Sequence, residues 1–288
     1  MKNLLGWINK KFRIADDYLH TYGLEYFAVD HCSLKCYGCS QCSPYLNEHF
    51  SDYKVFERSL KILKKHLRPR KLTILGGEPL LHPDIDSIIK IAKTSGMFEE
   101  IHITTNGTNI GKMSCDFWRN IDVLAISKYP SNSDNIDRMI SEVRKKCELY
   151  NVKLEIRDMK IFKHIVLSEE NADKNIIKEV FNKCIYKFYC HTLSDDKIFR
   201  CSPVVNFNKH KNKNNFAPYN NNDYLKIEDS DCFRIALFNY LNSTKPLDGC
   251  RFCLGTSGKE FSHRQMTKDE LENPDKIKVT VEMGYNSD

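Results

Sequence analysis

Cysteine is the residue type in this sequence that is best placed to do chemistry. The chain has 12 cysteines, and in a chain without a secretory signal clustered cysteines are more often metal ligands or catalytic groups than disulfides. Cys32, Cys36 and Cys39 have the spacing C-x3-C-x2-C. Three thiolates this close can hold three corners of a [4Fe–4S] cluster and leave one iron open to a small molecule. The alternative is structural zinc, with Cys42 or His31 as the fourth ligand.

A second group of cysteines lies in the last third of the chain. It consists of Cys184, Cys190, Cys201, Cys250 and Cys253, of which the last two form a C-x2-C. This grouping also suggests metal ligands. The remaining three, Cys115, Cys147 and Cys232, are scattered and fit packing, because free cysteine behaves as a small buried hydrophobic residue.

The elements that must position the first cysteine motif alternate between strand-like and helix-like segments. Strands are expected at residues 25–30, 71–75, 100–105, 122–127 and 152–157, and helices at residues 55–67, 85–92 and 135–150. Pro69 should end the first helix. This alternation predicts βαβ units and a parallel sheet, and five strands suit a partial or open barrel. Since ligands lie at the C-terminal ends of such strands, the cysteine motif and the segments at residues 76–79 and 105–107 should meet on one face.

The pattern changes after about residue 184. Residues 188–193 and 198–201 are strand-like, and residues 194–197 suit a hairpin turn between them. Residues 206–222 are rich in Asn and Lys and are expected to form a loop, and residues 232–241 are helix-like.

Composition limits the classes of protein to which the chain can belong. It has 288 residues and a mass of 33.7 kDa, enough for one large domain or one domain with a small appendage. Hydrophobic residues make up 41% and charged residues 28%, as in globular proteins. No apolar run is long enough to span a membrane, and residues 1–13 do not resemble a signal peptide, so we expect a cytoplasmic protein without membrane contact. The net charge of +6 is compatible with an anionic substrate or a Lys-rich surface, and no nucleic-acid-binding motif is visible.

The first cysteine motif, followed by Gly76-Gly77-Glu78-Pro79 after the second strand, resembles the pattern of radical S-adenosylmethionine (SAM) enzymes. The resemblance covers roughly residues 25–160 and implies an α/β fold with a partial (β/α)6 TIM-like barrel. It implies that Cys32, Cys36 and Cys39 hold a [4Fe–4S] cluster whose open iron binds SAM. Reductive cleavage of SAM, with an electron from a donor such as flavodoxin or ferredoxin, would then give a 5′-deoxyadenosyl radical that abstracts a hydrogen atom from the substrate.

The resemblance also implies which residues contact SAM. The segment Gly76-Gly77-Glu78-Pro79 matches the one that meets the methionine amino group. The glycines allow close backbone approach, and the Glu78 carboxylate can accept hydrogen bonds from the ammonium group. Thr105, Asn106 and Gly107 resemble the segment after the third strand.

Three further contacts with SAM are implied, two of them at other strand ends and one in the cysteine loop. Ser127 is expected to reach the ribose and Arg157 the SAM carboxylate, with a solvent-facing or salt-bridged role as the alternative for both. Family members usually carry an aromatic residue directly before the third cysteine, where it touches adenine. Here that position is Gly38, and the aromatic Tyr37 precedes it.

The second cysteine group is similar to the auxiliary-cluster extensions of radical SAM enzymes, called twitch and SPASM domains. The twitch form, with one additional [4Fe–4S] cluster in a small β-hairpin and helix domain, fits better because there are too few cysteines for two more clusters. We favour Cys201, Cys250 and Cys253 as ligands, with Cys184 or Cys190 as the fourth. A zinc ribbon-like or purely packed site is the alternative.

These assignments divide the chain into four parts. Residues 1–24 form an N-terminal extension, residues 25–170 the barrel core, which extends at most to about 183, residues 184–258 the auxiliary-cluster domain, and residues 259–288 a charged tail. Residues 31–40, 43–44 and 77–83 also resemble a narrower subgroup that is linked to carbohydrate and surface-polysaccharide pathways.

A cluster closed by four cysteines favours electron transfer, so the expected reaction is an oxidation. The radical would abstract hydrogen from an alcohol carbon of a sugar, nucleotide-sugar or aminocyclitol, a base would take a proton, and the auxiliary cluster would accept the electron. The sequence does not identify that base: Lys128, Tyr129, Glu155, Asp158 and His164 lie near strand ends.

Five other functions remain as alternatives. Sugar epimerisation, sugar dehydration and peptide maturation occur in relatives, although residues 1–24 are too short for the leader-peptide-binding domain that maturases usually carry. A non-catalytic Fe–S protein would have no need of the segment from Gly76 to Pro79. A zinc-stabilised binding module is the last alternative.

Overall fold

The computed structural model describes residues 14–15, 18–207 and 222–284. Its main feature is a sheet of nine strands in the order β10-β9-β8-β2-β3-β4-β5-β6, with β1 paired to β2. The strands of the parallel part are β2 (Tyr18–Val29), β3 (Leu67–Gly76), β4 (Glu100–Thr105), β5 (Val123–Lys128) and β6 (Lys153–Asp158). The predicted α/β fold with a mostly parallel sheet, consistent with a partial TIM-like barrel, is confirmed.

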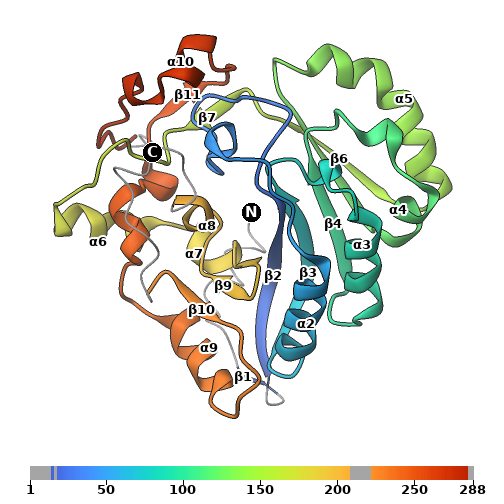
Figure 1. The fold of residues 1–288 in the computed structure, drawn as a ribbon, viewed down its shortest axis with the longest axis horizontal. Coiled ribbons are helices and arrows are strands. Elements are labelled where there is room, and N and C mark those ends of the chain that lie inside the picture. The colour runs from blue at the N-terminus through green and yellow to red at the C-terminus, as the bar shows by residue number, and fades with distance from the viewer. Residues whose placement is uncertain (1–13, 16–17, 208–221, 285–288) are drawn as a thin grey trace.

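Helices connect these strands and cover the outer face of the sheet (Figure 1). They are α2 (Tyr53–Leu63), α3 (Ile85–Thr94), α4 (Cys115–Asn120) and α5 (Ser133–Leu149). Apolar residues recur every three or four positions, as in Phe56, Leu60 and Leu63 of α2, and these face the sheet and are buried with Leu72 and Ile74 of β3.

Two predicted boundaries in this part were wrong. Strand β2 begins at Tyr18, so residues 18–24 belong to the sheet and not to an N-terminal extension. The first helix ends at Leu63, and Pro69 lies inside β3 opposite Thr21. Proline is tolerated there because β4 pairs with β3 only from Lys71 onward, so no ladder hydrogen bond is lost on that side.

The second half of the chain extends the same sheet. Strand β8 (Thr192–Ser194) lies parallel to β2 and forms a hairpin with β9 (Lys197–Phe199), which pairs with β10 (Tyr224–Lys226). The hairpin was predicted, but it is shorter than expected, because the predicted strand at residues 188–193 begins with the end of α7 (Tyr186–Tyr189). Its turn places Asp195 at a φ of 52°, a left-handed conformation that Asp tolerates.

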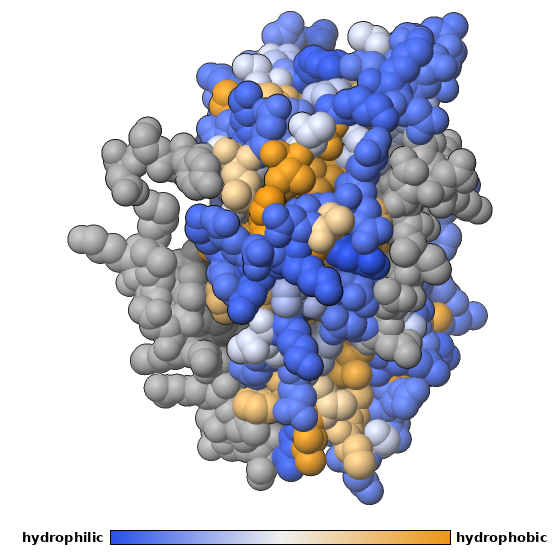
Figure 2. Space-filling view, turned by 90° about the vertical axis from the view of Figure 1, so that its left-hand side faces the viewer, coloured by the Kyte–Doolittle hydropathy of each residue, from blue (hydrophilic) through white to orange (hydrophobic). Residues whose placement is uncertain are grey.

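The second half of the chain also contains three further helices of four to ten residues. They are α6 (Lys174–Lys183), α8 (Val204–Phe207) and α9 (Phe233–Asn242), the last of which matches the predicted helix closely. Most of the loop expected at residues 206–222 lies outside the described residues. The left-hand side of the molecule is mostly hydrophilic, with small groups of apolar side chains at the surface (Figure 2). No helix among the described residues has the length and apolar character that crossing a bilayer requires.

The charged tail folds back over the C-terminal ends of the parallel strands. Strand β11 (Glu260–Ser262) pairs antiparallel with β7 (Ile161–Lys163), and α10 (Lys268–Glu272) follows it (Figure 1). We call residues 260–267 the C-terminal strap. This two-stranded sheet joins segments that are about a hundred residues apart in the sequence, and it lies next to the first cysteine motif.

Candidate functional site

One cavity gathers most of the residues that the sequence nominates for SAM and the first cluster. It has a volume of about 440 Å³ and lies at the C-terminal ends of β3 to β6. Its lining includes Cys32, Cys36, Cys39, Gly76, Gly77, Thr105, Asn106, Ser127 and Arg157. Parallel strands bring these residues together because their carboxyl ends share one edge of the sheet.

Gly76 and Gly77 are required by the close approach of two backbone segments. A Cβ at Gly77 would lie 1.9 Å from the carbonyl oxygen of His31, and one at Gly76 would lie 2.3 Å from that of Val29. Gly76 also has a φ of +149°, which favours glycine. The amide of Gly77 donates to Val29 O at 2.6 Å. The glycines therefore hold the end of β3 against the start of the cysteine loop.

Glu78 was expected to face the SAM ammonium group, but its carboxylate points elsewhere. It is fully buried and does not line the cavity. It accepts hydrogen bonds from Thr105 Oγ1 at 2.6 Å, from the Asn106 amide at 2.7 Å and from the Leu80 amide at 3.0 Å. Burial raises the pKa of Glu78 to about 6, and these three hydrogen bonds oppose that rise. The carboxylate thus fastens the end of β4, and Pro79 behind it is likewise buried outside the cavity.

The three cysteines of the first motif have surroundings that suit bound iron. Burial raises the pKa of Cys32 to about 11 and that of Cys36 to about 12, so a positive partner is needed to keep the thiolates. The Leu34 amide and Asn106 Nδ2 each donate to Cys32 Sγ at 3.4 Å. N–H donors around sulfur are typical of Fe–S sites. Within the described residues, no three His, Cys, Asp or Glu side chains are arranged around a single metal ion.

The C-terminal strap supplies a second set of contacts to the cysteine loop. His263 Nε2 lies 3.1 Å from Cys36 Sγ, and Gln265 Nε2 donates to the same sulfur at 3.4 Å. Backbone hydrogen bonds from Met266 N to Lys35 O and from Tyr37 N to Arg264 O fix the strap in place. No sequence pattern pointed to these residues, because they lie more than 220 positions from the motif.

The aromatic residue expected to touch adenine is displaced by the same strap. A side chain at position 38 would collide with Phe261, whose ring lies 2.5 Å from the place of a Cβ. Gly38 has a φ of +63° and lines the main cavity. Tyr37 instead lines a separate cavity of about 80 Å³ and stacks under the Arg264 guanidinium at 3.8 Å. Tyr37 is therefore not placed as the predicted cofactor contact.

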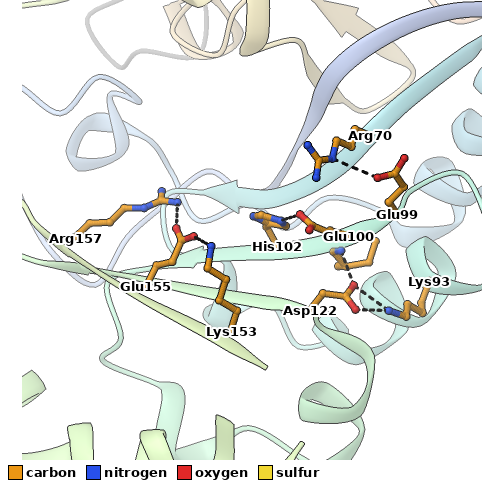
Figure 3. Close-up of polar contacts among 10 residues, drawn as sticks. Arg70, Lys93, Glu99, Glu100, His102, Asp122, Lys153, Glu155 and Arg157 are labelled. Carbon is orange, nitrogen blue, oxygen red and sulfur yellow. Dashed lines mark hydrogen bonds and ion pairs between the residues drawn. The ribbon is translucent and has the colours of Figure 1, made fainter. Parts of the chain in front are cut away.

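Ser127 and Arg157 line the main cavity from β5 and β6. Ser127 is buried, and Tyr129 beyond it belongs to the same wall. Arg157 Nη2 donates to Glu155 Oε2 at 2.9 Å, and Lys153 reaches the other oxygen of that carboxylate (Figure 3). Hydrogen bonds from Lys153 and Arg157 lower the pKa of Glu155 to about 2. Arg157 thus combines the two roles expected of it, a salt bridge and a position in the cavity.

Several cavity residues were not foreseen as binding residues. They come from β7, from the segments directly before and after it, and from α7: Met159, Ile161, Phe162, Lys163, Ile165 and Tyr186. No periodic signal marks this segment, because β7 is only three residues long and its partner β11 lies near the end of the chain.

The thiols of the second cysteine group lie close enough together to raise one another's pKa, and Cys190 shares this effect with Cys201 and Cys184. Burial, followed by the neighbouring thiols of Cys184, Cys201 and Cys250, raises the pKa of Cys253 well above its ordinary value. Gly255 contacts both ends of this set: its amide donates to Cys253 Sγ at 3.2 Å, and a Cβ there would lie 2.9 Å from Cys184 Sγ.

Cys190 faces the barrel strand β2. Burial and then the Glu25 carboxylate raise the pKa of Cys190 well above its ordinary value. Burial raises the pKa of Glu25 itself to about 7, and its hydrogen bonds to Cys190, Thr192 and Ser202 oppose that rise.

Comparison with known protein families gives a match in the barrel part of the chain. Residues 26–150 match the Radical SAM superfamily. This stretch, less than half of the chain, is therefore similar to a radical SAM domain. It carries the cysteine loop, Gly76, Gly77, Asn106 and Ser127, and so most of the lining described above.

The similarity to curated proteins covers only part of this chain and part of each relative. A probable GTP 3′,8-cyclase of Archaeoglobus fulgidus is 31% identical over 131 residues, which are 41% of this chain and 42% of that protein. The chain thus spans less than half the length of this curated relative.

Two solved structures show weak similarity to this chain. Native anSMEcpe with bound AdoMet and a Kp18Cys peptide has a TM-score of 0.49 at 14% identity, covering 82% of this chain and 88% of that one. BtrN in complex with AdoMet and 2-DOIA has a TM-score of 0.45 at 13% identity, covering 83% of this chain and 94% of that one. Likeness at this level does not identify the ligand of this chain.

Proposed function

We propose that the chain is a radical SAM enzyme that binds a [4Fe–4S] cluster on Cys32, Cys36 and Cys39. The observation that carries this proposal is the single cavity shared by these cysteines with Gly76 and Gly77. Buried thiols with N–H donors beside them fit a cationic iron cluster. When bound, the cluster and SAM would supply the hydrogen-atom abstraction that begins the reaction.

The chain's own residues would position SAM and the substrate. The exposed backbone edge at Gly76 and Gly77 offers carbonyl groups to the SAM ammonium group, and Arg157 offers a guanidinium to its carboxylate. Ser127 is available to the ribose. The cysteine loop lines the other side of the cavity, and the strap holds that loop in place through backbone hydrogen bonds.

We further propose that Cys184, Cys201, Cys250 and Cys253 hold an auxiliary [4Fe–4S] cluster. The effect of the other three thiols on the pKa of Cys253 supports this set. We leave Cys190 out because its side chain hydrogen-bonds to Glu25, although the thiols of Cys201 and Cys184 also raise its pKa. Four cysteines would leave no iron open, which favours electron transfer over direct substrate binding. Residues 184–258 are accordingly proposed as the auxiliary domain of a barrel that ends near residue 170.

The reaction we propose is the two-electron oxidation of a sugar or aminocyclitol alcohol. The carbon–hydrogen bond would break to the radical, the hydroxyl proton would leave to a base, and the second electron would pass to the auxiliary cluster. The cavity offers hydroxyl, amide and cationic groups, such as Thr104, Asn106 and Lys163, which suit a polyhydroxylated substrate. A flavodoxin- or ferredoxin-class protein would supply the initial electron.

A second candidate is a cyclisation of the kind named for the curated relatives. Its support is the 31% identity with a probable GTP 3′,8-cyclase over 131 residues. Those residues cover only part of either chain, so GTP belongs in the substrate panel beside sugars and peptides.

The first experiment is the iron and sulfide content after anaerobic reconstitution. We expect about eight irons in the wild type and about four in the Cys36→Ala and Cys253→Ala variants, because each cluster holds four irons. About four in the wild type, lost only with Cys36→Ala, would exclude the auxiliary cluster and the oxidation.

The second experiment tests the chemistry. With a reductant and SAM, the wild type should form 5′-deoxyadenosine, and Cys36→Ala should not; formation by that variant would contradict radical SAM chemistry at this site. Sugar alcohols, aminocyclitols, nucleotide sugars, peptides and GTP are then compared for coupling of cleavage to product. Coupling to peptides or to GTP alone would exclude the sugar substrate.

A further inference from the structure

The C-terminal strap places two side-chain nitrogens on a single cysteine sulfur. His263 Nε2 lies 3.1 Å and Gln265 Nε2 3.4 Å from Cys36 Sγ. Cys36 and His263 are both 7% exposed, so this contact is almost dry. Since a thiolate only accepts hydrogen bonds, His263 Nε2 is the donor when Cys36 is ionised.

Both side chains are held in place by other contacts. Gln265 Oε1 accepts from the Lys35 amide at 2.6 Å, and Gln265 Nε2 also donates to Ser131 Oγ at 3.0 Å. The His263 ring stacks on Tyr129, with ring centroids 4.8 Å apart and planes 27° apart. Its other nitrogen, Nδ1, is buried and has no hydrogen-bond partner within the described residues. The hydrogen bond to Cys36 is therefore the polar contact that the ring makes there.

The other two cysteines of the motif accept hydrogen bonds from residues outside the strap. Cys32 Sγ accepts from the Leu34 amide within the loop and from Asn106 at the end of β4. Hydrogen bonds of Cys39 to Gln41 and Ser43 oppose the rise in its pKa that burial causes. Cys36 alone depends on donors from the strap.

We propose that His263 and Gln265 are positioning residues that set the reduction potential of the cluster on Cys32, Cys36 and Cys39. The inference rests on the proposed radical SAM function. Reduction adds one negative charge, part of which resides on the sulfur ligands. N–H donors stabilise that charge, so they make the reduced state easier to reach. Removing either donor should make the cluster harder to reduce without removing a ligand.

The test is an equilibrium redox titration of the reconstituted full-length chain with Ti(III) citrate and mediators. The signal is the part of the reduced-cluster EPR spectrum that changes when SAM is added, because only a cluster with an open iron can respond. The variants are Gln265→Leu and His263→Phe, which remove the donors at similar volume. Ser262→Ala, an exposed position on the same strap, is the matched control.

We expect the ratio of reduced to oxidised cluster at a fixed potential to fall about tenfold in each donor variant, which for one electron is 59 mV. In Ser262→Ala it should stay within twofold of the wild type. Loss of iron from Gln265→Leu with full iron in Ser262→Ala would contradict the inference, because Gln265 would then hold the cluster in place and not set its potential.

Two failures are distinguishable. If the donor variants keep their iron and their cluster has the same reduction potential as in the wild type, the strap does not set the potential and the inference is wrong. If the wild type itself shows no SAM-responsive signal, or Cys36→Ala holds as much iron as the wild type, the proposed function fails first.

Discussion

Substituting Gly77 by alanine should separate the end of β3 from the cysteine loop. The new Cβ would lie 1.9 Å from His31 O, 2.4 Å from His31 C and 2.7 Å from Asp30 O. All three are backbone atoms, so no side chain can turn aside. Real Cβ atoms keep at least 3.0 Å, so the two segments must part by about 1.1 Å (3.0 minus 1.9).

The magnitude follows from the contacts that such a shift disturbs. The hydrogen bonds from Gly77 N to Val29 O and from Glu78 N to His31 O join the two segments, and each contributes about 1 kcal/mol. Overpacking adds about 1–3 kcal/mol. We therefore expect the free energy of unfolding to fall by about 3–5 kcal/mol, and the midpoint of thermal unfolding by roughly 6–10 °C at about 2 °C per kcal/mol.

The assay compares Gly77→Ala with Gly111→Ala in thermal unfolding and in iron content after reconstitution. A Cβ at Gly111 meets nothing within 4 Å, so that variant should unfold within about 1 kcal/mol of the wild type. Gly77→Ala should also lose the iron of the first cluster, because the shift lies one residue from Cys32. Equal unfolding midpoints and equal iron content in the two variants would refute this reasoning.

Three further predictions concern other parts of the chain. Because burial raises the pKa of Glu78 from 4.5 to about 6, the folded state binds its proton more tightly than the unfolded state. Stability from this group should therefore fall by about 2 kcal/mol as the pH rises through 4.5 to 6, and urea titrations should show that slope reduced in Glu78→Gln; an unchanged slope would exclude Glu78 as its source. Cys184→Ala should lose about four irons per chain and Cys190→Ala none, and the opposite pattern would reverse the ligand assignment. Asp52 caps α2 by accepting a hydrogen bond from the Lys54 amide at 2.8 Å, whereas Asp84 makes no such bond at α3. In thermal unfolding, Asp52→Ala should therefore lower the free energy of unfolding by about 1 kcal/mol and Asp84→Ala by much less. Equal losses in the two variants would show that the hydrogen bond of Asp52 does not stabilise α2.

The order of strands and helices in the barrel could be predicted because each depends on neighbouring residues. Strand β4 and helix α5 lie within two residues of their expected bounds, since their apolar periodicity is local. The start of β2 was missed because residues 18–24 acquire their role only by pairing with β3. Short elements such as β7 and β11 have no periodic signal and exist only as partners of each other.

The sequence by itself determined the chemistry of the site: the cysteine spacing, the glycine pair and the strand ends that carry them meet at one cavity. Only the tertiary structure decided which neighbours these groups have. It turned Glu78 toward β4, placed Cys190 against Glu25 and brought His263 and Gln265 to Cys36. The physical reason is that spacing along a chain reports local geometry, whereas contacts across more than 200 residues depend on how complete layers pack.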